Sequence, residues 1–182
     1  MIEINKNNCL AIINQEEIQN INFRWIDFVW YDFSKKNFAD CRFENCNLSN
    51  INIKNTTFNN IEFLKTKIVW LNFTEINIFL SHFNFYKCNI SFSYFMWMKL
   101  KNISFKESIV KESDFTNTNL ENSDFTNCDL EKTIFMNTNL FKANLIWAYN
   151  FLIDPRINKF KKTKFSHENA NLLLNYFDII ID

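Results

Sequence analysis

The sequence predicts an all-β fold in which the chain winds into a coil of short parallel strands. Three observations lead to this prediction. Large apolar residues recur at every fifth position over most of the 182 residues. A small residue often stands two positions before each of them. The chain has no Gly but is rich in Asn, which can replace Gly where a turn needs positive φ.

The five-residue period is clearest in "SDFTNTNLENSDFTNCDLEKTIFMNTNL", from Ser113 to Leu140. A helix repeats its buried face every 3.6 residues and a strand every 2.0, so neither element alone keeps these residues on one side. The same step runs from Phe23 to Phe83, then slips by two residues and continues from Ile90. Of the 22 Phe, 14 fall on these positions, so the period reflects the fold.

The small residue and the large one that follows it by two positions should both face inward, because alternate residues of a strand share a side. Each group of five is then one short strand that bends before the next begins. Phe alternates with Leu, Ile or Val from Phe95 to Leu140, which implies an even number of groups per coil. Four groups give a square tube with about 20 residues per coil, coils about 4.8 Å apart and roughly six coils. One face of this tube is expected to stack Phe23, Phe43, Phe63, Phe83, Phe105 and Phe125.

The chain then divides into three parts. Residues 1–20 precede the repeat and are expected to form an N-terminal cap. Residues 21–150 form the repeat, with the two-residue slip near 84–88. Residues 151–182 contain the only Pro, Pro155, which cannot donate to a strand ladder. We therefore expect a broken last coil there, followed by a capping helix and a tail.

The segments "ADCRFENCNLSN", "SDFTNTNLENSDFTNCDL" and "KANL" resemble the A-(D/N)-(L/F)-x-x repeat of pentapeptide-repeat proteins. This resemblance implies a right-handed quadrilateral β-helix. The stretch from Phe23 to Lys36 departs from the motif, because the small inward positions are occupied by Ile21, Ile26, Tyr31 and Lys36. We expect a wider or irregular coil there.

The C-terminal segment predicts a short helix and a terminal strand. Ser166 is a candidate N-cap, and Ala170, Leu173, Leu174 and Phe177 share one helical face. The stretch "NANLLLNYFDIIID" resembles the closing segment of the quinolone-resistance (Qnr-type) branch of the family. That resemblance implies a homodimer and an acidic rod that imitates DNA on type II topoisomerases. The predicted dimer interface consists of Ala170, Leu173, Leu174, Phe177, Ile179 and Ile181.

The sequence offers little for catalysis. Cys41, Cys46, Cys88 and Cys128 occupy small inward positions, where a thiol acts as a small hydrophobe. No glycine-rich phosphate loop is possible without Gly, and the two His of the chain are not expected to meet a carboxylate or a Cys. We therefore predict that the protein is not an enzyme and holds no cofactor or metal.

Two surface features are candidates for contact with a partner. The first is acidic and consists of Glu112, Asp114, Glu121, Asp124, Asp129 and Glu131, with no Lys or Arg between its ends. The second is apolar and is centred on Trp70, Phe92 and Trp97, at outward positions in the middle coils. Other apolar residues expected to face outward beside them are Val69, Phe79, Leu80, Phe85, Tyr86 and Met96. The Asp residues of the first set can equally serve only to bond nearby backbone at the corners, and the N-terminal segment can equally cover the second set.

The net charge is zero, and the start of the chain shows neither a signal peptide nor an apolar run of membrane-spanning length. We expect a cytoplasmic protein that binds neither membrane nor nucleic acid directly. The leading hypothesis is a dimeric protein-interaction rod, with a topoisomerase such as DNA gyrase as partner. The alternative is a structural or immunity-type binding protein that uses the apolar patch.

Overall fold

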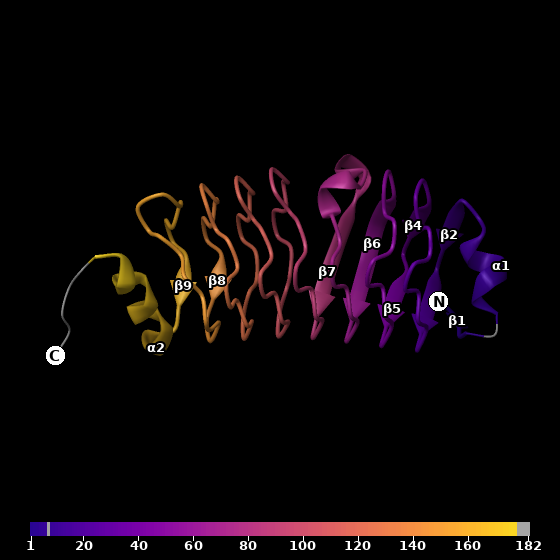
Figure 1. Ribbon diagram of the computed structural model, residues 1–182, viewed down its shortest axis with the longest axis horizontal. Coiled ribbons are helices and arrows are strands. Elements are labelled where there is room, and N and C mark those ends of the chain that lie inside the picture. The colour runs from indigo at the N-terminus through magenta and orange to yellow at the C-terminus, as the bar shows by residue number, and fades with distance from the viewer. Residues whose placement is uncertain (7, 178–182) are drawn as a thin grey trace.

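The computed structural model describes residues 1–6 and 8–177, which form a rod of stacked coils (Figure 1). The all-β prediction is confirmed, since the chain is a pentapeptide-repeat β-helix of about eight turns with a short C-terminal helix. The strands are β1 (Ile2–Ile4), β2 (Glu17–Gln19), β3 (Ile21–Arg24), β4 (Asn37–Ala39), β5 (Arg42–Glu44), β6 (Thr57–Leu64), β7 (His82–Tyr86), β8 (Asn144–Leu145) and β9 (Lys164–Phe165). The α-helices are α1 (Cys9–Ile13) and α2 (His167–Ala170), and the 3-10 helices are η1 (Phe73–Glu75), η2 (Ile78–Leu80) and η3 (Asn171–Tyr176). None of the helices in the described residues has the length and apolar character needed to cross a membrane.

Parallel pairing with a constant offset stacks the coils. Asn22 pairs with Arg42, and Asn144 pairs with Lys164, an offset of 20 residues in both cases. The prediction of roughly six coils is too low, because the ladder extends into both ends of the chain. Ile2–Ile4 pair with Ile21–Phe23, and β8 pairs with β9. The N-terminal and C-terminal segments therefore continue the β-helix.

Columns of parallel Phe rings fill the interior. Phe115 is fully buried, and its ring stacks on Phe95 at 4.8 Å and on Phe135 at 5.4 Å. Phe105, from the opposite face, meets Phe115 edge to face at 5.4 Å. Each such pair contributes about 0.5–1.5 kcal/mol beyond the burial of its apolar surface. Stacking within each column and edge-to-face contact between the two columns together explain why the aromatic residues recur every ten residues.

The small inward residues do more than save space. The hydroxyl of Thr118 donates to the carbonyl of Phe95 at 2.7 Å, and the thiol of Cys128 donates to the carbonyl of Phe105 at 2.9 Å. These carbonyls belong to corners of the preceding coil, where a buried acceptor needs a partner. Ser, Thr and Cys are therefore small enough to fit inside and also able to satisfy the backbone.

The corners of the coils use left-handed backbone conformations. Asn occupies many of them, as expected for a chain without Gly; Asn117, Asn122 and Asn127 have φ of 56°, 58° and 58°. Less expected is the presence of Trp. All five Trp of the chain adopt positive φ, and all five are exposed: Trp25, Trp30, Trp70, Trp97 and Trp147.

The register slip lies earlier than predicted. Phe63 pairs with Phe85, and Asn72 pairs with Tyr94, both 22 residues apart. Ile61 pairs with Phe83, again 22 residues apart. Residues 73–82 lie inside all three pairs, so the two extra residues lie in this stretch. The expected position near 84–88 is wrong, because Phe85 and not Phe83 continues the column, stacking on Phe63 at 5.1 Å and on Phe105 at 5.2 Å.

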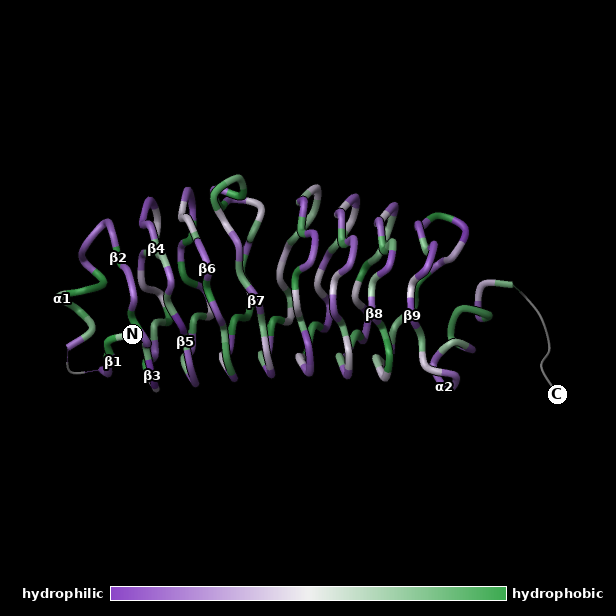
Figure 2. The backbone as a smooth tube through the Cα atoms, turned by 180° about the vertical axis from the view of Figure 1, so that it is seen from behind, coloured by the Kyte–Doolittle hydropathy of each residue, from purple (hydrophilic) through white to green (hydrophobic). Residues whose placement is uncertain are grey.

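The extra residues form a projection that we call the inserted loop, residues 73–80. It comprises η1 and η2, between β6 and β7 in Figure 1. Figure 2 shows it as a hydrophobic segment that stands out from the rod beside β7. Phe79 at its tip has 92% of its surface exposed. The loop begins in the core, where Phe73 stacks on Phe95 at 4.6 Å, and exposes Phe79 and Leu80 on the surface.

Both ends of the rod are covered by segments of the chain itself. At the N-terminal end, Ile4, Cys9 and Ile13 are buried in the core. At the C-terminal end, the amide of Asn169 donates to the carbonyls of Leu145 and Ala148 at 2.7 and 2.8 Å. These bonds satisfy acceptors that an open coil would leave unpaired.

Two irregularities expected from the sequence are absent from the described residues. The last coil is not broken, since Asn139 pairs with Lys159 and Asn144 with Lys164 at the usual offset. Pro155 lies in a turn, where its missing N–H costs no ladder bond. The coil from Phe23 to Lys36 is regular as well, because the core accommodates buried Ile21 and Ile26 within an unchanged register.

Candidate functional site

Three of the six acidic residues predicted as a partner surface are paired with cations of the preceding coil. The ammonium of Lys111 lies 2.7 Å from a carboxylate oxygen of Glu131 and 3.0 Å from one of Asp129. Lys101 lies 2.7 Å from Glu121. Both Lys precede their Glu by 20 residues, so the repeat spacing in the sequence contained this signal. Although no Lys or Arg lies between Glu112 and Glu131 in the sequence, cations of the preceding coil therefore neutralise part of this surface.

The remaining acidic residues have a mainly local role. Asp114 accepts a hydrogen bond from the backbone N–H of Thr116 at 2.7 Å, and Asp124 accepts one from that of Thr126 at 2.9 Å. These are the corner turns that Asp commonly makes. Glu112 is exposed and stands at a left-handed corner. Of the six carboxylates, it has the least contact with its surroundings in the described part of the chain.

The apolar residues predicted as the second surface do come together. Trp70 and Phe92 stand at the same corner of adjacent coils and stack at 4.4 Å, 7° from parallel. Trp97 stands at the next corner along the coil of Phe92 and is 75% exposed. Tyr94 and Met96 fill the outward positions between them. We call these five residues the aromatic surface.

Sequence reasoning misplaced some neighbours of this surface and missed others. Val69 and Phe85 were expected to point outward, but both are buried. Tyr94 and Ile78 were not assigned to the patch, although both face the same region. The position of the slip accounts for Phe85, since moving the two extra residues to 73–82 gives Phe85 the inward position that pairs with Phe63. It does not account for Val69, which precedes the slip.

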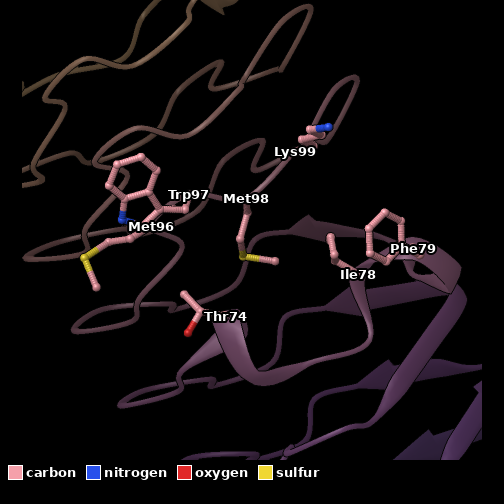
Figure 3. A pocket seen from close by; sticks show the side chains of 7 residues that line it. All are labelled: Thr74, Ile78, Phe79, Met96, Trp97, Met98 and Lys99. Atoms are coloured by element: carbon pink, nitrogen blue, oxygen red, sulfur yellow. The ribbon is translucent and has the colours of Figure 1, made fainter.

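A cleft of about 440 Å³ separates the inserted loop from the next coil. In Figure 3, Trp97 and Phe79 lie on opposite sides of it, with Met98 between them. Met98 is only 6% exposed and forms its floor. The full lining consists of Thr74, Ile78, Phe79, Met96, Trp97, Met98 and Lys99. The cleft is therefore mainly apolar, with one hydroxyl and one ammonium.

The backbone under the aromatic surface is in an unfavourable conformation for its side chains. Trp70, Phe92 and Trp97 have φ of 65°, 59° and 63°. A bulky residue with positive φ is a steric outlier, and Asn meets the same requirement at other corners with little cost. The same conformation recurs at corners along the whole rod, including those of Trp25, Trp30 and Trp147, so what distinguishes this face is the gathering of apolar side chains on it. This makes the aromatic surface the strongest candidate site on the rod.

The Cys residues are placed for structure. All five are free and buried, and burial raises the pKa of Cys46 to about 11 and of Cys88 and Cys128 to about 12. These thiols remain protonated at neutral pH, so they are poor nucleophiles and poor metal ligands. Within residues 1–6 and 8–177, no group of His, Cys, Asp and Glu has the arrangement of a metal site.

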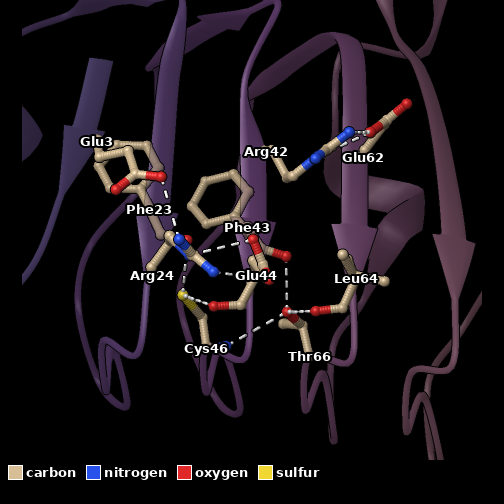
Figure 4. A network of polar contacts seen from close by, with 10 residues as sticks. All are labelled: Glu3, Phe23, Arg24, Arg42, Phe43, Glu44, Cys46, Glu62, Leu64 and Thr66. Carbon is tan, nitrogen blue, oxygen red and sulfur yellow. Dashed lines mark hydrogen bonds and ion pairs between the residues drawn. The ribbon is translucent and has the colours of Figure 1, made fainter. Parts of the chain in front are cut away.

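Charged ladders bind the N-terminal coils together (Figure 4). The guanidinium of Arg24 lies 3.0 Å from Glu3 in the coil before it and 3.2 Å from Glu44 in the coil after it. Arg42 makes the same kind of pair with Glu62. These contacts join equivalent positions of successive coils, and we assign them a structural role.

The residues predicted to form a dimer interface differ in exposure. Ala170, Leu173 and Leu174 are half-buried, and Leu173 packs against the core. Phe177 is 46% exposed. Ile179 and Ile181 lie outside the described residues. The helix predicted from Ser166 is short and continues as η3, so its apolar residues do not form one continuous α-helical stripe.

Comparison with known proteins supports this architecture. The family "Pentapeptide repeats (8 copies)" matches residues 21–60, and the family "SV2A/B/C luminal domain" matches residues 68–152. No curated protein sequence matches the chain. The solved structure of full-length QnrB1, a plasmid-mediated fluoroquinolone resistance protein, is similar with a TM-score of 0.66 and 18% identity. The similarity covers 97% of this chain and 95% of the QnrB1 chain.

A trypsin-treated QnrB1 variant gives a TM-score of 0.67 at 18% identity, covering 99% of this chain and 95% of the other. At this identity the likeness establishes the fold. The repeat motif, the constant offset between paired coils and the corner geometry all agree with it. The chain therefore has the pentapeptide-repeat β-helix fold, with the repeat matched over residues 21–60, and QnrB1 is a structural neighbour over nearly its whole length.

Proposed function

We propose that this protein is a non-catalytic rod that binds a protein partner through the aromatic surface, and that the partner is a type II topoisomerase. The observation that carries the proposal is the group of exposed aromatic side chains held at left-handed corners. Trp and Tyr are enriched among the residues that dominate binding energy in protein interfaces. Contiguous exposed apolar side chains on one face commonly mark such interfaces.

The choice of topoisomerase rests on similarity. The fold follows QnrB1, a fluoroquinolone resistance protein, over 97% of this chain. The closing segment around Leu172–Leu174 also resembles the Qnr-type branch, whose members act on topoisomerases. These likenesses favour one class of partner, and the aromatic surface provides the means of contact.

The acidic segment contributes less to this proposal than the aromatic surface does. Lys101 and Lys111 neutralise three of its six carboxylates. Asp114 and Asp124 bond their own corners. A rod that imitated DNA would present a row of free negative charge, whereas the contact proposed here depends mainly on apolar burial.

The test is binding to purified DNA gyrase, measured by biolayer interferometry and by the effect of the added protein on DNA supercoiling by gyrase. We expect Trp70→Ala and Trp97→Ala to weaken binding at least tenfold. Trp147→Ala is the matched control, because Trp147 is equally an exposed Trp at a left-handed corner but lies on another part of the rod. If gyrase does not bind, or if all three variants bind as the wild type does, the proposal fails.

A further inference from the structure

We infer that the cleft beside the inserted loop is a docking site for a polypeptide segment in which an apolar side chain is followed by a carboxylate. The inference deepens the proposed function, since it names the part of a protein partner that the rod holds. It depends on three properties of the cleft: its size and lining, its continuity with the aromatic surface, and the charge of Lys99.

The size and lining of the cleft suit one or two large apolar side chains. Its volume of about 440 Å³ falls in the range of binding pockets, which are mostly apolar with a few polar groups. Two Met side chains, Met96 and Met98, contribute to it. Met is unbranched and polarizable, so it adapts to the shape of the group it contacts. The cleft is therefore a suitable seat for Leu, Phe or Met of a partner.

Continuity with the aromatic surface argues for a chain segment as occupant. Phe92, Tyr94, Met96 and Trp97 are successive outward residues of one coil, and the last two also line the cleft. A ligand seated in the cleft therefore has an apolar path leading away from it across the face of the rod. A polypeptide can fill both the cleft and this path, whereas a small molecule fills only the cleft.

The positive charge of Lys99 favours a bound segment that carries a negative charge. Lys87, Lys101 and Lys111, on the same and neighbouring coils, each pair with a carboxylate one coil further on. Lys99 has no ion pair among the described residues, because the equivalent position one coil further on is Asn119. The nearest acidic residue of the inserted loop, Glu75, bonds to the amide of Asn72 instead. An unneutralised ammonium beside an apolar cleft is complementary to a carboxylate that follows an apolar anchor.

The experiment uses the full-length protein labelled with ¹³C at the methyl groups of Met. The chain has four Met, of which Met96 and Met98 line the cleft. Met136, exposed and outside the cleft, is an internal reference. The probe is the blocked peptide acetyl-Ser-Ala-Leu-Phe-Asp-Ala-Ser-amide at millimolar concentration. A second peptide with Lys in place of Asp is its matched control.

We expect the Asp peptide to shift the signals of Met96 and Met98 and to leave that of Met136 unchanged. The Lys peptide should bind about fivefold more weakly, the scale of a single partly exposed ion pair. In the variant Lys99→Glu this preference should reverse. Lys106 is exposed and lies outside the cleft. The variant Lys106→Glu should keep the wild-type preference for the Asp peptide, which would show that the net charge of the protein does not set this preference.

Three outcomes overturn the inference. The first is the absence of any shift at Met96 and Met98. The second is equal affinity for the two peptides. The third is slow rotational tumbling of the protein in the absence of peptide, together with faster tumbling of the Lys99→Glu variant. This result would mean that a second copy of the chain fills the cleft. Peptide binding without gyrase binding would leave the inference standing and reject only the named partner, so the two proposals fail separately.

Discussion

Trp70 and Phe92 lie face to face across two coils, with ring centroids 4.4 Å apart and planes 7° from parallel. Both rings stand at left-handed corners on the outside of the rod. The stack lies outside the core, and the corner itself does not require an aromatic ring, because Asn50 and Glu112 adopt the same conformation at the equivalent corners of the neighbouring coils. We propose that the two rings serve contact with a partner.

The first prediction concerns this stack. Phe92→Asn should lower affinity for the protein partner about tenfold, because Trp70 loses the ring that fixes its orientation. Thermal stability should change little, since Asn tolerates positive φ. Titration of the partner, together with a melting curve, measures both. A large loss of stability with unchanged affinity would assign the stack to folding.

The second prediction concerns corner strain away from the aromatic surface. Trp147→Asn should stabilise the protein by about 0.5–1 kcal/mol, because Asn adopts the left-handed conformation at lower cost than Trp. Asn127 occupies the equivalent corner of the preceding coil, so Asn127→Trp is the reciprocal test and should destabilise. Denaturation in urea measures both variants. Equal stabilities would show that the corners tolerate Trp freely.

The third prediction concerns the core. Phe115→Ala should cost about 3–5 kcal/mol, because it opens a cavity between Phe95 and Phe135, on which Phe115 stacks. Phe79→Ala is the control, since Phe79 is almost fully exposed, and it should have a small effect. Urea denaturation again provides the comparison. A loss below about 1 kcal/mol for Phe115→Ala would contradict the stacking.

The fourth prediction concerns Lys111. Hydrogen bonds to Glu131 first, and to Asp129 second, raise its pKa above the usual 10.5. Lys111→Met should lower the melting temperature because it leaves nearly buried Asp129 without its cation. Since the pKa is raised in the folded state, the stabilisation is complete below pH 10.5 and disappears as pH rises through the raised pKa.

The difference in melting temperature between wild type and Lys111→Met should therefore be constant near neutral pH and should narrow above about pH 11. Lys99→Met is the control, since Lys99 has no carboxylate partner among the described residues. It should leave the melting temperature nearly unchanged. A difference that is independent of pH up to pH 12 would show that the ammonium does not stabilise the fold.

The fifth prediction concerns oligomeric state. We expect the full-length protein to be a dimer of twice 22.0 kDa, and deletion of residues 167–182 to give a monomer. Phe177→Asp should also give a monomer while preserving the cap, because Phe177 is half-exposed and Asn169 makes the capping bonds. Light scattering at micromolar concentration measures the mass. A full-length monomer would leave this segment only the capping role.

The sequence was sufficient to predict the coil because one rule, a large inward residue every five positions, is repeated in every coil. Two features escaped it. The first is the extent of the β-helix. Ile18 and Phe165 keep the register near the two ends, but small residues and Asn are sparse there, so the pattern in the sequence is weak. The slip was placed too late, because Phe83 and Phe85 both fit an inward position, and only the pairing with Phe63 distinguishes them.

The candidate site was predicted in outline for a related reason. Trp70, Phe92 and Trp97 were identifiable because they are apolar at outward positions. The cleft was not, since it depends on where the inserted loop lies relative to Met98. The neutralisation of Glu121 and Glu131 was also missed, although their cations lie one coil earlier in the sequence. Contacts between coils become readable only when the sequence is compared with itself at the repeat length.

The constant offset between paired coils also bears on how the chain reaches its native state. Asn119 pairs with Asn139 and also with Lys99, so each residue meets its partners within one coil of chain on either side. No contact of the ladder requires the two termini to come together. Short loops close at low entropic cost, and such chains fold quickly for a β protein. A finished coil can serve as the template for the next, so the rod can lengthen in step with its synthesis, and the projection at residues 73–80 is the one place within the described ladder where that growth must accommodate two additional residues.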